Sequence, residues 1–164
     1  WKASRNSTST AGQCPVRRRE LWLDTDPLFA SACHCHSCQK RTGSAFSLWL
    51  VIPTAALAIS GELTPWSRVS DKGTGNTRYS CAACGNIIYG IGDDSAELAK
   101  LQAGTLEDTR EVEPEVHIWA REKQPWVKLP AHAQPLNPQP AEAIQLLPAA
   151  LDYRAAAGAA KTEQ

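Results

Sequence analysis

Residues 33–40 read CHCHSCQK, and the cysteines of this stretch decide the fold that the sequence predicts. Cys33, Cys35 and Cys38 form a C-x-C-x-x-C pattern, and further along the chain Cys81 and Cys84 form a C-x-x-C pair. A C-x-x-C turn directs two sulfurs to one point, and the glycine that follows the second pair permits the backbone to aim its amides at the thiolates. The predicted use of these residues is therefore to bind zinc.

Disulfide bonding is the alternative use of the cysteines. The chain has 164 residues and 6 cysteines, a fraction well below the roughly 8–10% that marks a disulfide scaffold. Three cysteines crowded within residues 33–38 suit a metal ion better than bridges. A chain of this length buries a sizeable core without disulfides, so we expect one main domain.

The spacing leaves two divisions of the sulfurs open. In the first, four cysteines close one structural site that has no free coordination position: Cys35, Cys38, Cys81 and Cys84. In the second, the sulfurs form two groups of three: Cys33, Cys35 and Cys38, and Cys14, Cys81 and Cys84. Three ligands in one short loop leave a fourth position for water or substrate, which is typical of a catalytic zinc.

Composition argues against two classes of partner. Lys and Arg total 17, Asp and Glu also total 17, and the formal net charge is zero. Proteins that bind nucleic acid or anionic membranes usually carry an excess of Lys and Arg, so we expect neither partner. The longest apolar run, around residues 48–52, is far shorter than the ~20 residues of a membrane span. Residues 1–10 have no apolar core and do not resemble a secretory signal, so we expect a cytoplasmic location.

The composition divides the chain into three zones. We predict a disordered Ser/Thr-rich lead-in at 1–11, a zinc-binding β domain at 12–129 and a Pro/Ala-rich tail at 130–164. Ile144, Leu147 and Leu151 have helical spacing, but Pro148 interrupts them, so the tail holds at most a marginal helix. Within the β domain, short β-branched and aromatic runs bounded by turn residues predict strands in a mostly antiparallel arrangement, at 17–23, 45–52, 77–80, 87–89 and 116–120. Residues 53–57 predict a helical turn, and residues 93–101 fit a helix or a strand.

The cysteine blocks resemble those of the glutathione-dependent formaldehyde-activating enzymes, also called the centromere-protein-V-like family, which has the Mss4-like zinc fold. The first block, residues 33–46, is similar to the family's C-x-C-x-x-C-x-K with its small-residue turn and aromatic strand. The second block is RYSCAACG at 78–85. The third begins with GTLED at 104–108 and continues through a Trp-rich ending at 117–126. The resemblance covers about residues 12–129 and implies a mainly β, antiparallel Mss4-like domain.

The resemblance implies a role for each cysteine. Three of them match the ligands of a catalytic zinc: Cys33, Cys35 and Cys38. Cys81 and Cys84 match two ligands of a structural zinc, whose other two ligands come from an N-terminal C-x-C in the family. Here Cys14 matches the second of those cysteines, and Gly12 stands at the position of the first. The resemblance therefore implies a second zinc site that lacks one thiolate.

The resemblance also implies an activity. It is that of a carbon–sulfur lyase acting on thiol–aldehyde adducts, such as glutathione plus formaldehyde giving S-hydroxymethylglutathione. A zinc held by three cysteines would lower the pKa of the thiol and hold its thiolate for attack on the aldehyde carbon. The alternative is a non-catalytic, zinc-stabilised binding or chaperone-like module, because a fold does not fix an activity.

Other polar residues lie near the cysteines in the sequence. His34 and His36 are candidates for a fourth ligand or a proton shuttle, but neighbours of ligands in a tight turn generally point away from the metal, and we expect that here. For His117, within a predicted strand, we expect a buried and hydrogen-bonded imidazole rather than a ligand. Lys40 and Arg41 are candidates to contact the carboxylates of a glutathione-like substrate.

Overall fold

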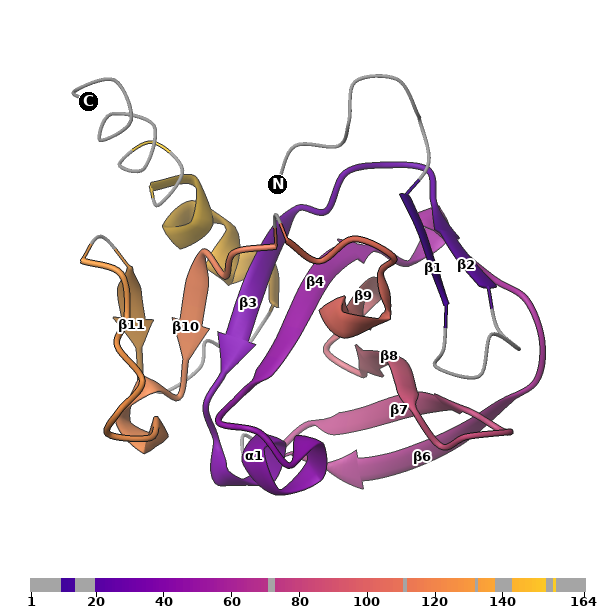
Figure 1. The fold of residues 1–164 in the computed structure, drawn as a ribbon, viewed down its shortest axis with the longest axis horizontal. Coiled ribbons are helices and arrows are strands. Elements are labelled where there is room, and N and C mark those ends of the chain that lie inside the picture. The colour runs from indigo at the N-terminus through magenta and orange to yellow at the C-terminus, as the bar shows by residue number, and fades with distance from the viewer. Residues whose placement is uncertain are drawn as a thin grey trace. The chain divides into compact units, whose positions relative to one another are not determined.

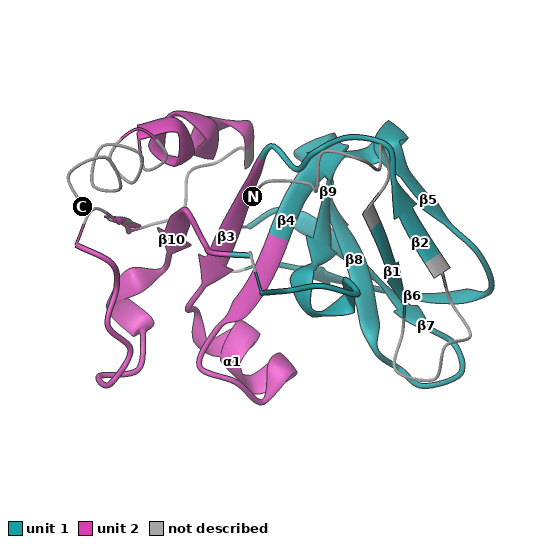
Figure 2. Ribbon diagram, turned by 45° about the horizontal axis from the view of Figure 1, so that its top comes forward, with its two compact units in different colours: residues 1–28, 50–112 teal, residues 29–49, 113–164 magenta. Residues whose placement is uncertain are grey.

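The computed structural model describes residues 10–13, 20–70, 73–110, 112–131, 133–137, 143–152 and 155. These residues form a mainly β protein, as the sequence predicts (Figure 1). The chain divides into two compact units, one made of residues 1–28 and 50–112 and the other of residues 29–49 and 113–164 (Figure 2). No helix in the described part of the chain is long and apolar enough to cross a membrane.

The first unit is built from antiparallel strands. Among the described residues, the strands that lie wholly in this unit are β1 (Thr10–Gln13), β2 (Glu20–Leu23), β5 (Leu57–Ile59), β6 (Leu63–Val69), β7 (Gly75–Cys81), β8 (Ile87–Gly92) and β9 (Ser95–Gln102). Strand β2 pairs with β1 and β5, while β6, β7, β8 and β9 pair in sequence order. Two 3-10 helices, η1 (Thr54–Ala56) and η2 (Ala103–Thr105), complete this unit.

The second unit contains the first cysteine block. Its elements are β3 (Phe29–Cys33), α1 (His36–Thr42), β10 (Val116–Ile118), η3 (Ala120–Glu122), β11 (Gln134–Leu136) and η4 (Ala143–Leu146). Strand β4 (Ser47–Pro53) begins in this unit and ends in the first. Strand β10 pairs in parallel with both β3 and β11. Parallel pairing requires a long connection, and the chain between β3 and β10 supplies it.

Most of the predicted elements are confirmed. The runs at 45–52, 77–80, 87–89 and 116–120 fall on β4, β7, β8 and β10, and β2 occupies the described end of 17–23. The helical turn at 53–57 is the 3-10 helix η1, and the ambiguous run at 93–101 is the strand β9. Strands β1, β3, β5 and β6 and helix α1 were not predicted.

The tail carries structure that its composition did not predict. Strand β11 lies there, and residues 147–152 are helical. The expectation that Pro148 interrupts a helix is wrong, because Pro148 lies in the first turn, where no intrahelical bond needs its missing N–H. Leu146 and Ala150 are buried. Residues 1–9 of the predicted lead-in lie outside the described residues. Its last two residues, Thr10 and Ala11, pair with β2 in β1, so the prediction of disorder is wrong for them, and the boundary at 129 remains a prediction.

Candidate metal centre

The first cysteine block is shaped by the end of β3 and the start of α1. Cys33 is the last residue of β3, and Cys35 is the N-cap of α1 with φ −60° and ψ 146°. The Sγ of Cys35 accepts a hydrogen bond from the Cys38 N–H at 3.4 Å, so a sulfur takes the place of the usual hydroxyl or carboxylate cap. Gly43, in the left-handed region with φ 64°, ends the helix by donating its N–H to the Gln39 carbonyl at 2.9 Å. This short helix holds Cys38 next to Cys35.

The three sulfurs of this block lie close together in the protein interior. The Sγ atoms of Cys33 and Cys35 are 3.6 Å apart, and those of Cys33, Cys35 and Cys38 all lie within 4.8 Å of one another. Each of these residues is less than a tenth exposed. Tetrahedral zinc with bonds of about 2.3 Å separates its thiolates by about 3.8 Å, so the group fits this ion, and soft sulfur donors favour zinc over hard cations. The second division of the sulfurs, with its group of three in the loop, matches this geometry.

The electrostatics of the group already favour one thiolate. Hydrogen bonds from Cys33 and Cys35 lower the pKa of the Cys38 thiol, and the guanidinium of Arg41 lowers it further. The pKa of Cys33 is raised by its hydrogen bond to Cys35, by the neighbouring Cys38 and by burial. These contacts favour the thiolate form at Cys38 and the thiol form at Cys33. A bound metal has to displace the remaining thiol protons, so its affinity rises with pH.

Arg41 is folded against the cysteine block. Its Nη2 donates to the Cys38 Sγ at 3.6 Å and to the Ser47 Oγ at 3.4 Å. Its guanidinium also lies over the Trp49 ring, 5.1 Å from the ring centroid. Lys40, the preceding cation, is exposed. Of the two cations expected to contact a substrate, only Lys40 therefore extends into solvent.

His34 and His117 form a buried pair. Ala32 is the pairing partner of His117 on the neighbouring strand. Successive side chains of an extended chain alternate between the two faces of a sheet. His34 therefore lies on the same face as Ala32 and His117, and Cys33 lies on the other face. His34 Nε2 lies 3.0 Å from His117 Nδ1, and the two rings stack with centroids 5.3 Å apart. Both expectations are confirmed: the His34 ring turns to His117, and His117 is buried and hydrogen-bonded.

Both imidazoles of this pair are neutral near pH 7. Burial lowers the pKa of His34 to about 4, with further contributions from His117 and Lys123, and burial also lowers the pKa of His117. In a neutral pair one nitrogen donates and the other accepts. The two outer nitrogens, His34 Nδ1 and His117 Nε2, are buried, and no described residue forms a hydrogen bond with them. One outer nitrogen is therefore an unpaired donor and the other an unpaired acceptor.

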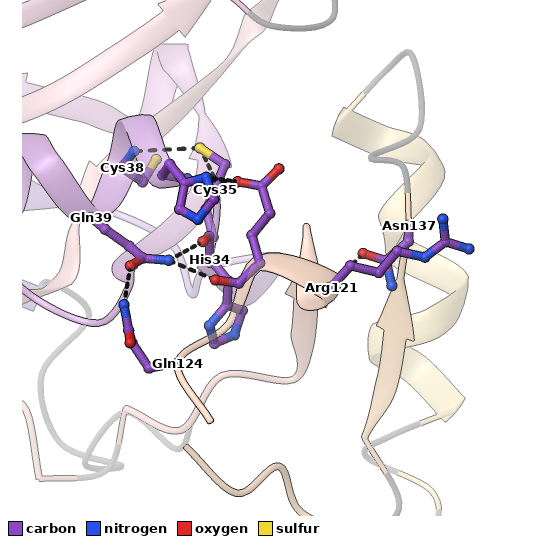
Figure 3. A network of polar contacts seen from close by, with 10 residues as sticks. His34, Cys35, Cys38, Gln39, Arg121, Gln124 and Asn137 are labelled. Carbon is purple, nitrogen blue, oxygen red and sulfur yellow. Dashed lines mark hydrogen bonds and ion pairs between the residues drawn. The ribbon is translucent and has the colours of Figure 1, made fainter. Parts of the chain in front are cut away.

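Gln39 ties the cysteine block to the chain after β10 (Figure 3). Its Nε2 donates to the main-chain carbonyls of His34 at 2.6 Å and Glu122 at 2.8 Å. Its Oε1 accepts from the Gln124 Nε2 at 2.6 Å. Both donors and the acceptor of one side-chain amide are thus used to join two segments that are distant in sequence. We call Gln39, Glu122 and Gln124 the Gln39 clamp.

His36 contacts the same segment, the chain that follows β10. Its main-chain N–H donates to the Glu122 Oε2 at 2.7 Å, and its Nδ1 lies 3.4 Å from the same oxygen. The group of residues that could hold a metal contains neither His36 nor His34.

Trp119, the first residue after β10, has φ 55° and is the one non-glycine residue with positive φ among the described residues. Such a conformation costs of order 1–3 kcal/mol and persists only where the surroundings enforce it. One contact within this turn is the hydrogen bond that the Glu122 N–H donates to the Trp119 carbonyl at 3.0 Å.

Sequence comparison assigns the chain to a family. Residues 9–122 match the profile described as glutathione-dependent formaldehyde-activating enzyme. The chain belongs to this family. A protein of Emericella nidulans with the provisional name of glutathione-dependent formaldehyde-activating enzyme is 36% identical over 77 residues, which are 47% of this chain and 39% of that protein. A protein of Penicillium rubens with the same provisional name is 34% identical over 77 residues, which are 47% of this chain and 40% of that protein.

The matched stretch spans about two-fifths of the length of these two relatives. Among solved structures, a protein of Rhodobacter sphaeroides superimposes with a TM-score of 0.49 at 17% identity, covering 62% of this chain and 91% of that chain.

The structure describes only two residues of the second cysteine group of this family member, Cys81 and Cys84. Cys81 ends β7 and is buried, whereas Cys84 is exposed. Gly85, with φ 71°, closes the turn between them by donating its N–H to the Cys81 carbonyl at 2.8 Å. Cys14 lies outside the described residues. Within the described ranges, Cys33, Cys35 and Cys38 are the one group of three or more His, Cys, Asp or Glu side chains close enough to share an ion.

Gly12 occupies a packed position in this family member. It lies buried in β1, opposite Leu21 of β2. A Cβ at residue 12 would lie 2.5 Å from the Thr105 carbonyl oxygen and 3.1 Å from the Leu21 side chain. This is too close for any side chain unless the backbone shifts. The close packing of β1 against η2 and β2 therefore explains the glycine at this position.

Proposed function

We propose that this protein is a zinc-dependent carbon–sulfur lyase that acts on thiol–aldehyde adducts, with glutathione and formaldehyde as its substrates and S-hydroxymethylglutathione as the adduct. The observation that carries the proposal is the buried group of three sulfurs at Cys33, Cys35 and Cys38, within the region that matches the family. Three thiolates would hold a zinc ion and leave one position for a substrate. When bound, the zinc supplies positive charge that stabilises the thiolate form of a thiol.

The proposed addition of a thiol to an aldehyde requires no oxidant or reductant. In the forward direction the sulfur of the thiol forms a bond to the aldehyde carbon, and the carbonyl π electrons pass to oxygen. The proton that leaves the thiol is the one that the new hydroxyl carries. The reverse direction breaks the same carbon–sulfur bond. The contribution of the protein is then to position the reactants and to stabilise charge.

The residues around the sulfurs support this role. The Gln39 clamp fixes the loop that carries Cys35, and the neutral His34–His117 pair adds no positive charge that would compete with a metal beside the sulfurs. Lys40, which is exposed, is the cation available to a carboxylate of glutathione. A reducing compartment such as the cytoplasm would keep these thiols able to bind metal.

A second zinc is part of the proposal. Cys14, Cys81 and Cys84 would hold it in a structural role, with three thiolates rather than four because Gly12 carries no side chain. Such a site would contribute directly to folding stability, since the energy of structural zinc binding is folding energy. Its metal should exchange more easily than that of a complete four-cysteine site.

The test combines metal content with exchange kinetics. Zinc per chain is measured by mass spectrometry for the wild type, for Cys33→Ala, and for Ser44→Ala, an exposed residue close to the block that serves as the control. The rate of exchange between free and adducted glutathione in the presence of carbon-13 formaldehyde is then followed by NMR, with and without each protein. The proposal predicts that the wild type and Ser44→Ala accelerate exchange and that Cys33→Ala loses one zinc together with the acceleration.

Two outcomes would contradict the proposal. A zinc content that Cys33→Ala leaves unchanged would assign the metal to a closed site without Cys33 and would support the binding-module alternative. If Cys33→Ala loses one zinc as expected but the wild type does not accelerate exchange, the metal centre exists and does not act on these two substrates. Circular dichroism of each variant ensures that a loss of zinc is not a loss of fold.

A further inference from the structure

A charged side chain, that of Arg41, contacts one sulfur of the group directly. Arg41 approaches Cys38 with Nη2 at 3.6 Å from Sγ, and Ser47 Oγ and the Trp49 ring fix the same guanidinium. Arg41 and Cys38 lie three residues apart on α1, so both side chains project from the same face of the helix. The contact therefore follows from the helix itself.

The charge of this contact complements the charge of the sulfurs. Three thiolates around one divalent cation leave one net negative charge in a buried place, and a buried charge is unfavourable unless it is paired. The guanidinium supplies the opposite charge beside Cys38. A donor to a ligating thiolate also fixes its direction, and partners of this kind commonly contribute 10–100-fold to metal affinity.

The planar guanidinium suits the position in a way that an ammonium does not. It stacks over Trp49 while Nη2 is shared between the Cys38 sulfur and the Ser47 hydroxyl. A lysine at residue 41 would keep the charge but would lose the flat group that stacks on the indole. The Nη1 of Arg41 is also buried, and no described residue forms a hydrogen bond with it.

We propose that Arg41 is a positioning residue for the metal centre: it orients the Cys38 thiolate and balances the net negative charge of the metal-loaded sulfur group. This inference rests on the proposed binding of metal by Cys33, Cys35 and Cys38, and it does not depend on which reaction the centre performs. In this inference Arg41 acts on the metal centre, and Lys40 is the cation that would contact a carboxylate of the substrate.

The experiment compares Arg41→Met and Arg41→Lys with Lys40→Met, which removes one positive charge from the exposed neighbouring position of the same helix. Zinc affinity is measured by competition with a chromophoric chelator, and the thiolate-to-cobalt charge-transfer band is recorded after loading with Co²⁺. We expect Arg41→Met to weaken zinc binding at least tenfold and to shift the band. We expect Arg41→Lys to weaken binding less, and Lys40→Met to match the wild type in both readouts.

The outcomes separate this inference from the proposed function. If Arg41→Met binds zinc like Lys40→Met and gives the wild-type cobalt spectrum, Arg41 has no role at the metal and the inference is overturned. If Arg41→Met does not fold, Arg41→Lys decides, since a shifted band supports the inference and an unchanged band with unchanged affinity overturns it. If the wild type binds neither ion, the proposed metal site itself fails, whatever the variants do.

Discussion

His34 Nε2 lies 3.0 Å from His117 Nδ1, which joins the residue between two candidate metal ligands to the middle of β10. The bond pairs two nitrogens that would otherwise be buried without partners. Since each ring already leaves its outer nitrogen unsatisfied, the pair depends on this one interaction. The stacking of His34 on His117 and its tilted contact with Phe46 complete the packing.

We predict that replacing one member of the pair is worse than replacing both. His117→Phe leaves the buried His34 without a partner and should lower the free energy of unfolding by about 1–3 kcal/mol. The double variant His34→Phe/His117→Phe removes the polar groups together and should recover part of that loss. Urea unfolding of the metal-free protein measures both effects. A double variant as unstable as the sum of the two single variants would contradict the prediction.

The same pair predicts how stability depends on pH. Both histidines have a folded-state pKa below the ordinary 6.5, and that of His34 is about 4. Between these values the unfolded chain binds protons that the folded protein does not. Stability is therefore complete above pH 6.5 and is lost as the pH falls toward 4, with a slope of up to about 1.4 kcal/mol per pH unit for each histidine.

Urea unfolding at pH 7.5, 6, 5 and 4, in the presence of a chelator and a reductant, measures this slope. The double phenylalanine variant should show a flatter profile over the same range. Asp108, whose pKa a hydrogen bond from Arg110 lowers to about 2, acts only below its ordinary value of 3.8 and does not enter this window. A profile of the double variant that is as steep as that of the wild type would assign the slope to other groups.

The Gln39 clamp predicts an energetic coupling across two distant segments. Gln39→Ala releases the carbonyls of His34 and Glu122 and the amide of Gln124, and we expect it to destabilise the protein by about 1–3 kcal/mol. The double-mutant cycle with Gln124→Ala should give a coupling energy of about 0.5–3 kcal/mol, as for other directly bonded pairs. Chemical unfolding measures all four states. Lys40→Ala, at the exposed neighbouring residue, is the control, and additive effects of the two glutamine substitutions would refute the clamp.

Sequence patterns could predict the metal loop but not its surroundings. The C-x-C-x-x-C spacing is local, so it brings three sulfurs together whatever the rest of the fold does. The contact between His34 and His117 depends on the parallel register of β3 and β10, which no local pattern reveals. Gln39 and Glu122 meet for the same reason, after a separation of 83 residues. The clamp and the histidine pair therefore became visible only in the structure.

The missed elements also have physical explanations. Strand β3 reads FASAC, and its small residues have little β propensity, so burial and pairing with β10 rather than propensity place it. Strand β6 contains Pro65, which argues against a central strand and is tolerated because β6 lies at the edge of its sheet. The N-cap of helix α1 is Cys35, and cysteine is not one of the usual capping residues, so the sequence carried no recognisable start signal.

The packing of Gly12 predicts the effect of a cysteine at this position, where the family resemblance implies a zinc ligand. Gly12→Cys should lower the free energy of unfolding by about 1–3 kcal/mol, because a Cβ there meets the Thr105 carbonyl oxygen at 2.5 Å and either β1 or η2 has to shift. Gly12→Ala is the matched variant, since it introduces the same Cβ without a sulfur. The two variants should be destabilised alike in chemical unfolding, and neither should hold more zinc per chain than the wild type. A Gly12→Cys protein that is more stable than Gly12→Ala and binds zinc more tightly would show instead that β1 can move to complete a four-thiolate site with Cys14, Cys81 and Cys84.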